Sequence, residues 1–163
     1  MDNEKITRIA EAIVKSMQVS NTDTTKFGLE KARLLISKVE KKAAEMGLSV
    51  VVAVSNEAAR PIAVECMDDS YIASYDVALN KAFTAVALKM STRTLGTLAA
   101  PGASLYGIQH TNEGKIVIFG GGEPLKYNGK IIGGLGVSGG SEEEDSCLSS
   151  YGASIIDEIM MNG

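Results

Sequence analysis

The sequence has few of the residues that build disulfide frameworks and metal clusters. Its 163 residues include no tryptophan, three prolines, two cysteines and one histidine. Cys66 and Cys147 lie far apart and form no C-x-x-C pair, so we expect two reduced core residues in a cytoplasmic protein. Because His110 is the only histidine, a metal site built on several histidines is excluded.

Positive charge and long apolar runs are also scarce. Sixteen lysines and arginines stand against 20 aspartates and glutamates, a formal net charge of -4. This balance provides no basic field for a phosphate backbone and argues against nucleic-acid binding. No apolar run approaches the ~20 residues of a membrane-spanning helix, and the charged N-terminus lacks the apolar core of a secretory signal. With 45% apolar and 22% charged residues, the chain fits one soluble globular domain.

Helical spacing of apolar residues predicts several helices. Their expected ranges are 3–18, about 24–46 after a cap at Asp23 or Thr24, 71–90, a further turn at 91–98, and 141 to about 161. Asp68-Asp69-Ser70 is expected to cap the helix over 71–90. Ser141 and Glu144 have the spacing of a capping box at the start of the last helix.

Valine- and isoleucine-rich runs predict strands. Five are expected, over 48–56, 61–67, 115–121, 124–127 and 130–138. The last two are joined by Asn128-Gly129, a strong hairpin signal because both residues tolerate positive φ. Short turns between strands imply antiparallel pairing, so the predicted fold class is α+β, with helices on a five-stranded antiparallel sheet.

Glycine is concentrated in one part of the chain. Thirteen of the 17 glycines fall between Gly96 and Gly140. The run 134–139 matches the dinucleotide pattern G-x-G-x-x-G, but the four acidic residues at 142–145 would repel a pyrophosphate, and too little chain follows for a second parallel strand. Glycine in a strand marks close approach to its backbone. At Gly133, Gly134 and Gly136 the neighbour is expected to be a helix, another subunit or a flat ligand.

Few side chains carry recognisable chemistry. Lys81 lies on the alanine-rich face of its helix, where a lysine either extends to the edge or pairs with a carboxylate. Lys81 and Asp68 are the candidate catalytic residues, and Asp68 has the alternative role of a helix cap. His110 lies in a loop, where it is either a solvated or structural side chain or an axial ligand to haem iron, which needs one imidazole.

Three stretches together carry a family resemblance. They are the step Gly121-Gly122-Glu123-Pro124-Leu125, the glycine-rich strand Ile132–Gly140, and the acidic helix start containing Asp145. With Val50–Val54, Met67-Asp68 and Lys81–Ala85 upstream, residues 24–160 resemble the GlcG/HbpS family, which includes the C-terminal domain of PduO-type corrinoid adenosyltransferases. The chain departs from the family at Val54–Ala58, where V-D-x-x-G is usual, and at Asp69-Ser70, where Gly-Ala is usual.

The resemblance implies a profilin-like α/β/α sandwich, self-assembly as a homo-oligomer, often an octamer, and binding of haem or a related tetrapyrrole in some members. We therefore expect His110 to ligate haem iron and glycine-rich backbone to lie beside the macrocycle. The expected cofactor-binding residues are His110, Gly120, Gly121, Gly122, Gly133, Gly134, Gly136 and Ser138.

Residues 1–20 precede the family-like domain, which is expected to span 21–163. An amphipathic helix over 3–18 followed by a polar linker resembles the encapsulation peptides of bacterial microcompartment cargo, and such a helix needs a partner surface. Its partner is either a microcompartment shell or the protein's own oligomer.

Three functions follow as hypotheses. The first is a tetrapyrrole-binding accessory protein, cytoplasmic or inside a microcompartment. The second is an enzyme acting on a small metabolite of glycolate or diol metabolism, with Lys81 and Asp68 in its site. The third is a structural assembly module whose glycines serve subunit packing.

Overall fold

The computed structural model describes residue 7 and residues 26–162. Apart from Thr7, the predicted helix over 3–18 and its linker lie outside the described residues, so the expected boundary at 20/21 stays a prediction. The elements follow in the order α2 (Leu29–Glu45), β1 (Val51–Asn56), β2 (Pro61–Cys66), α3 (Ser74–Ala87), α4 (Thr92–Ala99), η1 (Ile108–His110), η2 (Asn112–Gly114), β3 (Gly122–Tyr127), β4 (Lys130–Ser138), α5 (Glu142–Ser154) and α6 (Ile156–Asn162).

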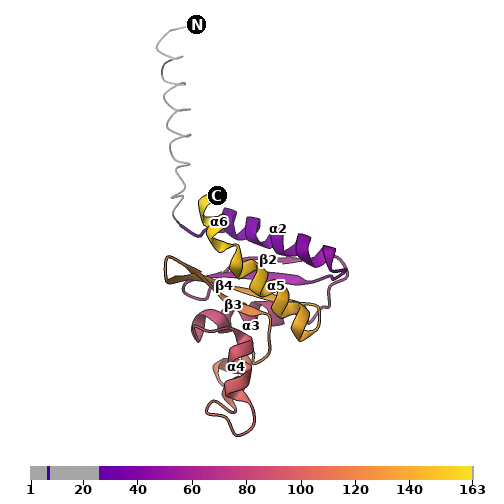
Figure 1. Cartoon of the computed structure of the whole chain (residues 1–163), viewed down its shortest axis with the longest axis vertical. Helices are drawn as coiled ribbons and strands as arrows, with labels where there is room; N and C mark the ends of the chain where they lie inside the picture. The colour runs from indigo at the N-terminus through magenta and orange to yellow at the C-terminus, as the bar shows by residue number, and fades with distance from the viewer. Residues whose placement is uncertain (1–6, 8–25, 163) are drawn as a thin grey trace.

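One antiparallel sheet lies between two layers of helices. Its strand order is β2-β1-β4-β3, with the first strand paired to the last, Val51 opposite Ser138. Helices α2, α5 and α6 cover one face, and α3 covers the other (Figure 1). The predicted mixed fold with a single antiparallel sheet is confirmed. No helix in the described part of the chain is long and apolar enough to cross a membrane.

Strand β1 is buried on both sides and therefore has no polar alternation. Val50, Val52 and Val54 pack into the larger core with α2, α5 and α6, whereas Val51 and Ala53 pack against α3. Full burial of an aliphatic side chain contributes ~1.5–3 kcal/mol, so a continuous valine run is stable only between two layers.

The prediction of a strand over 115–121 is wrong, and within the described residues the sheet has four strands rather than five. The first part of this segment bonds a helix side chain and not a neighbouring strand. The Val117 N–H donates to Thr84 Oγ1 on α3 over 3.0 Å, and the same hydroxyl donates to the Lys115 carbonyl over 3.2 Å. Ile116 and Val117 are buried. Burial against helices, rather than strand pairing, explains the apolar run.

Local turn signals had mixed outcomes. The capping box of Ser141 and Glu144 is confirmed, as is the turn at Asn128-Gly129, where φ is +49° and +74°. The predicted cap at Asp68-Asp69-Ser70 is wrong: α3 begins at Ser74 after Ala73, with no side-chain cap bond. Instead, the Ser70 N–H bonds the Met67 carbonyl over 3.2 Å, and this turn replaces the cap.

Two other expectations need correction. The last predicted helix is interrupted, since α5 ends at Ser154 and α6 begins at Ile156. Cys66 and Cys147 are exposed free thiols rather than core residues. Cys66 lies at the end of β2, an edge strand, and Cys147 lies on the solvent side of α5, so neither side chain faces a layer interface.

Candidate functional site

Helix α3 lies unusually close to strand β4. A Cβ atom on Gly136 would collide with the Ala78 carbonyl, and one on Gly134 would collide with the Ala82 carbonyl. Both carbonyls belong to α3, so these strand glycines leave room for helix backbone. Gly133 faces the other way, toward the Phe27 ring. Of the neighbours expected for the strand glycines, a helix of the same chain is the one found at Gly134 and Gly136.

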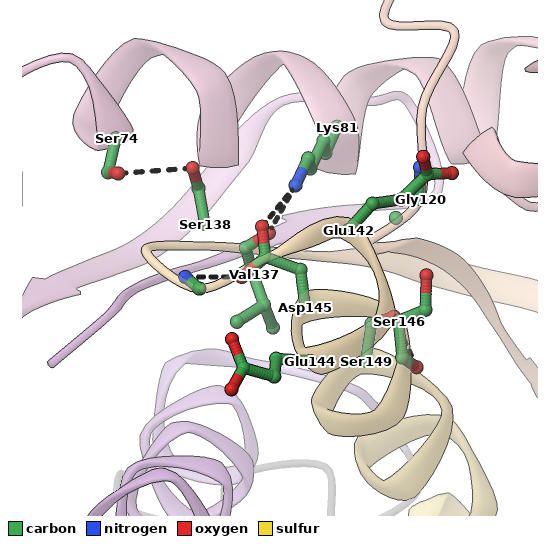
Figure 2. A network of polar contacts seen from close by, with 12 residues as sticks. Ser74, Lys81, Gly120, Val137, Ser138, Glu142, Glu144, Asp145, Ser146 and Ser149 are labelled. Carbon is green, nitrogen blue, oxygen red and sulfur yellow. Dashed lines mark hydrogen bonds and ion pairs between the residues drawn. The ribbon is translucent and has the colours of Figure 1, made fainter. Parts of the chain in front are cut away.

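Close packing of α3 brings Lys81 into the protein interior. Its side chain is fully buried, and its Nζ donates to the Val137 carbonyl over 2.8 Å and to Asp145 Oδ2 over 2.7 Å. Figure 2 shows the lysine pointing from α3 past β4 toward the start of α5. Of the two predicted roles, extension to the edge or pairing with a carboxylate, the structure shows the pairing.

Asp145 joins three elements. Its Oδ2 accepts from Lys81, and its Oδ1 accepts from the Gly140 N–H over 2.9 Å. The capping box holds the first turn of α5 in register: Ser141 Oγ accepts from the Glu144 N–H, and Glu144 Oε2 accepts from the Ser141 N–H. The pair therefore fixes α3, the end of β4 and the start of α5 relative to one another.

Burial controls the protonation of this pair. It lowers the pKa of Lys81, against the attraction of Asp145 and Glu142. Burial also raises the pKa of Asp145, against Lys81 and the N–H groups of Gly140 and Gly139. Each charge is stable in the interior mainly because of its partner, so loss of one partner leaves the other as an uncompensated buried charge.

Three predicted cofactor-binding glycines, Gly120, Gly121 and Gly122, lie beside the Lys81–Asp145 pair. A Cβ on Gly121, where φ is +110°, would be 2.6 Å from both Lys81 Nζ and the Val137 carbonyl. The Gly120 N–H donates to Glu142 Oε1 and the Gly122 N–H to Thr92 Oγ1, each over 2.9 Å. Only glycine leaves this space. Gly120–Gly122, Lys81 and Asp145, with the groups that hydrogen-bond to them or lie against the glycines, therefore form one network, which we call the Lys81 network.

The Lys81 network reaches the surface at one aromatic ring and contains one unsatisfied hydroxyl. Lys81 Nζ lies 5.0 Å from the centroid of the Phe119 ring, which is 43% exposed. Ser146 Oγ is buried without a hydrogen-bond partner in the described structure and lies against Gly120. Ser138 bonds Ser74 across the start of α3, with 3.1 Å between hydroxyls (Figure 2).

The remaining predicted site residues lie apart from the Lys81 network. Asp68 is exposed in the turn after β2, and among the described contacts none joins it to Lys81. The carboxylate partner of Lys81 is Asp145 instead. His110 is exposed in η1, on the long loop that follows α4. Within the described residues no group of three metal-ligating side chains occurs.

The sequence did not predict that the hydroxyls of Thr84, Thr92 and Ser146 belong to the site. Each bonds or faces backbone of the 115–122 segment from a helix. Threonine and serine within helices carry no periodic signal of such a role, since they are common on exposed helix faces as well.

Comparison with known proteins now adds to this geometry. A family model described as "Haem degrading protein HbpS-like" matches residues 27–154. The chain belongs to the HbpS-like family. The matched segment contains the whole Lys81 network and the His110 loop.

Three relatives of this HbpS-like chain are informative. It is 42% identical to an uncharacterized 15.0 kDa protein of Citrobacter freundii from the dhaT-dhaS intergenic region, over 89% of this chain and 99% of that protein. It is 33% identical to the corrinoid adenosyltransferase PduO of the same organism, over 94% of this chain but 47% of PduO, so it corresponds to about half of that enzyme. Among solved structures, a complex titled PduOC:Heme superposes with a TM-score of 0.76 at 34% identity, covering 79% of this chain and 94% of that one.

Proposed function

We propose that this HbpS-like chain is an accessory protein that binds haem or a related tetrapyrrole, with His110 as the axial ligand to iron. One observation carries the proposal: the only imidazole of the chain is exposed, and no described hydrogen bond or ion pair uses its ring. An unpaired, accessible imidazole suffices for axial ligation. The similarity to a protein whose structure is titled as a haem complex supports the choice of ligand.

The loop that carries His110 has features that suit a flat, largely apolar ligand. The loop projects beyond α3 with α4, away from the sheet (Figure 1). Tyr106 on the same loop is 66% exposed, and Phe119 at its end is 43% exposed. Beside His110, Gln109 Oε1 is buried without a hydrogen-bond partner in the described structure. The loop thus offers aromatic surface and two polar groups for which the described residues provide no partner.

The chain and the haem would contribute different chemistry. Bound haem would supply the redox and ligand-exchange chemistry of iron. The chain would hold the imidazole, cover part of the macrocycle with aromatic side chains and limit access of water. The buried glycines Gly120–Gly122 anchor the C-terminal end of the loop next to Phe119. Direct contact of a macrocycle with Gly133, Gly134, Gly136 or Ser138 stays a prediction, and at Gly134 and Gly136 it requires α3 to move.

A homo-oligomer is part of the proposal, with an octamer as its finer form. An exposed apolar cluster at the start of α3 supports it: Ile72 is 97% exposed, Tyr71 72% and Tyr75 47%. Adjacent large apolar side chains in solvent are typical of interaction surfaces. Light scattering on the purified chain measures the mass, and replacing Ile72 with Lys should lower it.

Localisation to a microcompartment is the remaining part of the proposal. It depends on the sequence pattern of residues 3–18, with its apolar stripe and polar linker. Removing residues 1–20 should abolish co-localisation with a shell and leave the oligomer intact. Dissociation of the oligomer on removal would instead indicate that the segment packs on its own assembly.

Haem titration tests the central proposal. We expect a shift of the Soret band when haem is added to the purified chain, and a weaker, shifted band in His110→Ala. Ser104→Ala, an exposed change on the same loop, is the matched control and should bind like the natural chain. An unchanged haem spectrum with the natural chain would refute the proposal. Equal spectra of the natural chain and His110→Ala would remove His110 as the ligand.

The enzyme and assembly hypotheses differ from this proposal in observable ways. An enzyme using Lys81 requires substrate access to a fully buried amine that Asp145 and Val137 already bind. A purely structural module forms a stable oligomer and leaves the haem spectrum unchanged. The same titration, with the mass measured alongside, therefore separates the hypotheses.

A further inference from the structure

A cavity lies where α3 meets the hairpin of β1 and β2. Its volume is about 230 Å³. None of its lining residues belongs to the Lys81 network or to the His110 loop tip. Its walls are mainly apolar, with Ala53, Pro61, Leu79 and Phe83 among the contributing side chains. A cavity of this kind favours a ligand that has an apolar body.

The cavity also carries positive charge. Arg60, in the hairpin turn, and Lys115, at the start of the extended segment, both line it. Glu113 binds Lys115 over 2.6 Å, and this lysine holds the pKa of Glu113 below its ordinary value of 4.5. In the described structure no ion pair or side-chain hydrogen bond uses the Arg60 guanidinium. Since one cation is neutralised and the other is not, the cavity has a net positive charge.

A third polar group completes the set. Asn80, on α3, lines the same cavity and is half-buried. No described hydrogen bond uses its side-chain amide, which has two N–H donors. The nearby Ser55 hydroxyl is already directed to the Ala82 carbonyl, at 3.5 Å. Arg60 and Asn80, whose polar side-chain groups have no partner among the described residues, therefore line one apolar cavity from two different elements.

We propose that this cavity binds a small organic anion, a carboxylate or phosphate carried on an apolar body of a few carbons. The oxyanion would accept hydrogen bonds from Arg60 and Asn80, and the body would contact Leu79, Pro61 and Phe83. Charge-assisted bonds from a planar guanidinium suit both head groups. The cavity is smaller than the ~300–1,000 Å³ of drug-sized sites, so it takes a small metabolite and not a whole tetrapyrrole. The site is therefore independent of the haem proposal.

Amide chemical shifts of the full haem-free chain provide the test. Benzoate, phenyl phosphate and butyrate are the anionic probes, benzyl alcohol is the neutral match and inorganic phosphate is the bare oxyanion. Saturable shifts are expected around residues 53–61 and 79–83 with at least one anionic probe. Which of benzoate and phenyl phosphate binds more tightly identifies the head group.

Three substitutions assign the binding to the named groups. Arg60→Gln should raise Kd about tenfold, because it removes a charge-assisted hydrogen bond. Asn80→Asp should abolish binding, because it puts a carboxylate against the anion. Arg33→Gln removes the same charge from the exposed side of α2, on the opposite face of the sheet, and should leave Kd unchanged. Thermal melts of each variant establish that it is folded.

Any of four results would overturn the proposal. They are no saturable shifts with any anionic probe, benzyl alcohol binding as tightly as benzoate, equal loss in Arg33→Gln and Arg60→Gln, or full binding by folded Asn80→Asp. If inorganic phosphate binds as tightly as phenyl phosphate, the apolar walls contribute nothing and the assignment of an apolar body is wrong.

Discussion

The two faces of the sheet are packed on different principles. On the face covered by α2, α5 and α6, large aliphatic side chains interdigitate, among them Leu35, Ile36 and Leu135. On the face covered by α3, alanines and strand glycines bring backbone against backbone, and the largest buried side chain is a lysine. The first face can accommodate an added methyl group because side chains can shift. The second cannot, because its contacts are carbonyl groups and a buried ion pair.

The largest effect is expected from breaking the Lys81–Asp145 pair. Lys81→Met should destabilise the protein by ~3–5 kcal/mol, because Asp145 is left as a buried charge without its partner. Adding Asp145→Leu should recover part of that loss, since no uncompensated charge remains. Urea unfolding of both single variants and the double variant gives the coupling between them.

The exposed pair of Lys38 and Glu158 serves as the control. Its nitrogen and oxygen are 2.9 Å apart, close to the 2.7 Å of the buried pair. Lys38→Met should change the unfolding midpoint little, because solvent screens this pair. If both lysine variants lose equal stability, burial is not what distinguishes the two pairs.

On the face of large side chains, removing volume should be costly. Leu135 is fully buried among α2 and α5 residues. Leu135→Ala should cost ~2–5 kcal/mol, the sum of lost burial and the cavity left behind. Unfolding in urea measures the loss, and a value below 1 kcal/mol would mean that this face collapses freely around the deletion.

On the face of α3, adding volume should be costly. Gly136→Ala should destabilise the protein by ~1–3 kcal/mol or more, because the new methyl group meets the Ala78 carbonyl. Gly152→Ala on α5 is the matched change on the opposite face. There the methyl group meets the movable side chains of Leu135 and Val39, and alanine favours the helix.

We therefore expect Gly152→Ala to be tolerated better than Gly136→Ala, as measured by thermal melts. The reverse order would contradict the distinction between rigid and adaptable faces.

The smallest change in stability is expected at Glu144, whose pKa is shifted in the opposite direction to that of its neighbour Asp145 on α5. The N–H and hydroxyl of Ser141 hold the pKa of Glu144 below its ordinary 4.5, whereas burial raises the pKa of Asp145. A lowered pKa means that the Glu144 contribution is present above pH 4.5 and is lost as the pH falls through its folded value. Glu144→Gln should therefore be less stable than the natural chain at pH 7, and the difference should shrink on acidification below pH 4.5.

Urea midpoints across this range provide the measurement. A difference that stays constant with pH would show that the capping box does not depend on the charge of Glu144.

Local chemistry made much of the fold predictable. The capping box of Ser141 and Glu144, the turn at Asn128-Gly129 and the valine strand each depend on residues a few positions apart. Predictions were wrong where the tertiary structure overrode the local sequence pattern. Asp68-Asp69 has the composition of a cap, yet a turn ends there before the helix begins. Residues 115–121 have the composition of a strand, yet the Lys115 carbonyl and the Val117 N–H bond the Thr84 hydroxyl of α3 instead of a neighbouring strand.

The candidate site was predictable in part. The sequence placed Lys81 on a small-residue helix face with two alternatives, and indicated a close neighbour for the strand glycines without identifying it. The structure resolves both, since α3 is that neighbour at Gly134 and Gly136 and Asp145 is the carboxylate. No sequence pattern predicts the cavity at Arg60 and Asn80, because its two hydrogen-bond donors come from separate elements.

By itself the sequence determined most of the element types, the antiparallel hairpins, the family resemblance and the strand glycines that mark close approach to the backbone. These follow from φ/ψ preferences and from apolar periodicity, which act over a few residues. Only the tertiary structure decided that Lys81 meets Asp145, 64 residues further along the chain, and that the segment 115–121 lies against helices instead of forming a strand. The reason is physical: a buried charge and an extended backbone both need partners, and distant parts of the chain supply them only after the layers have packed.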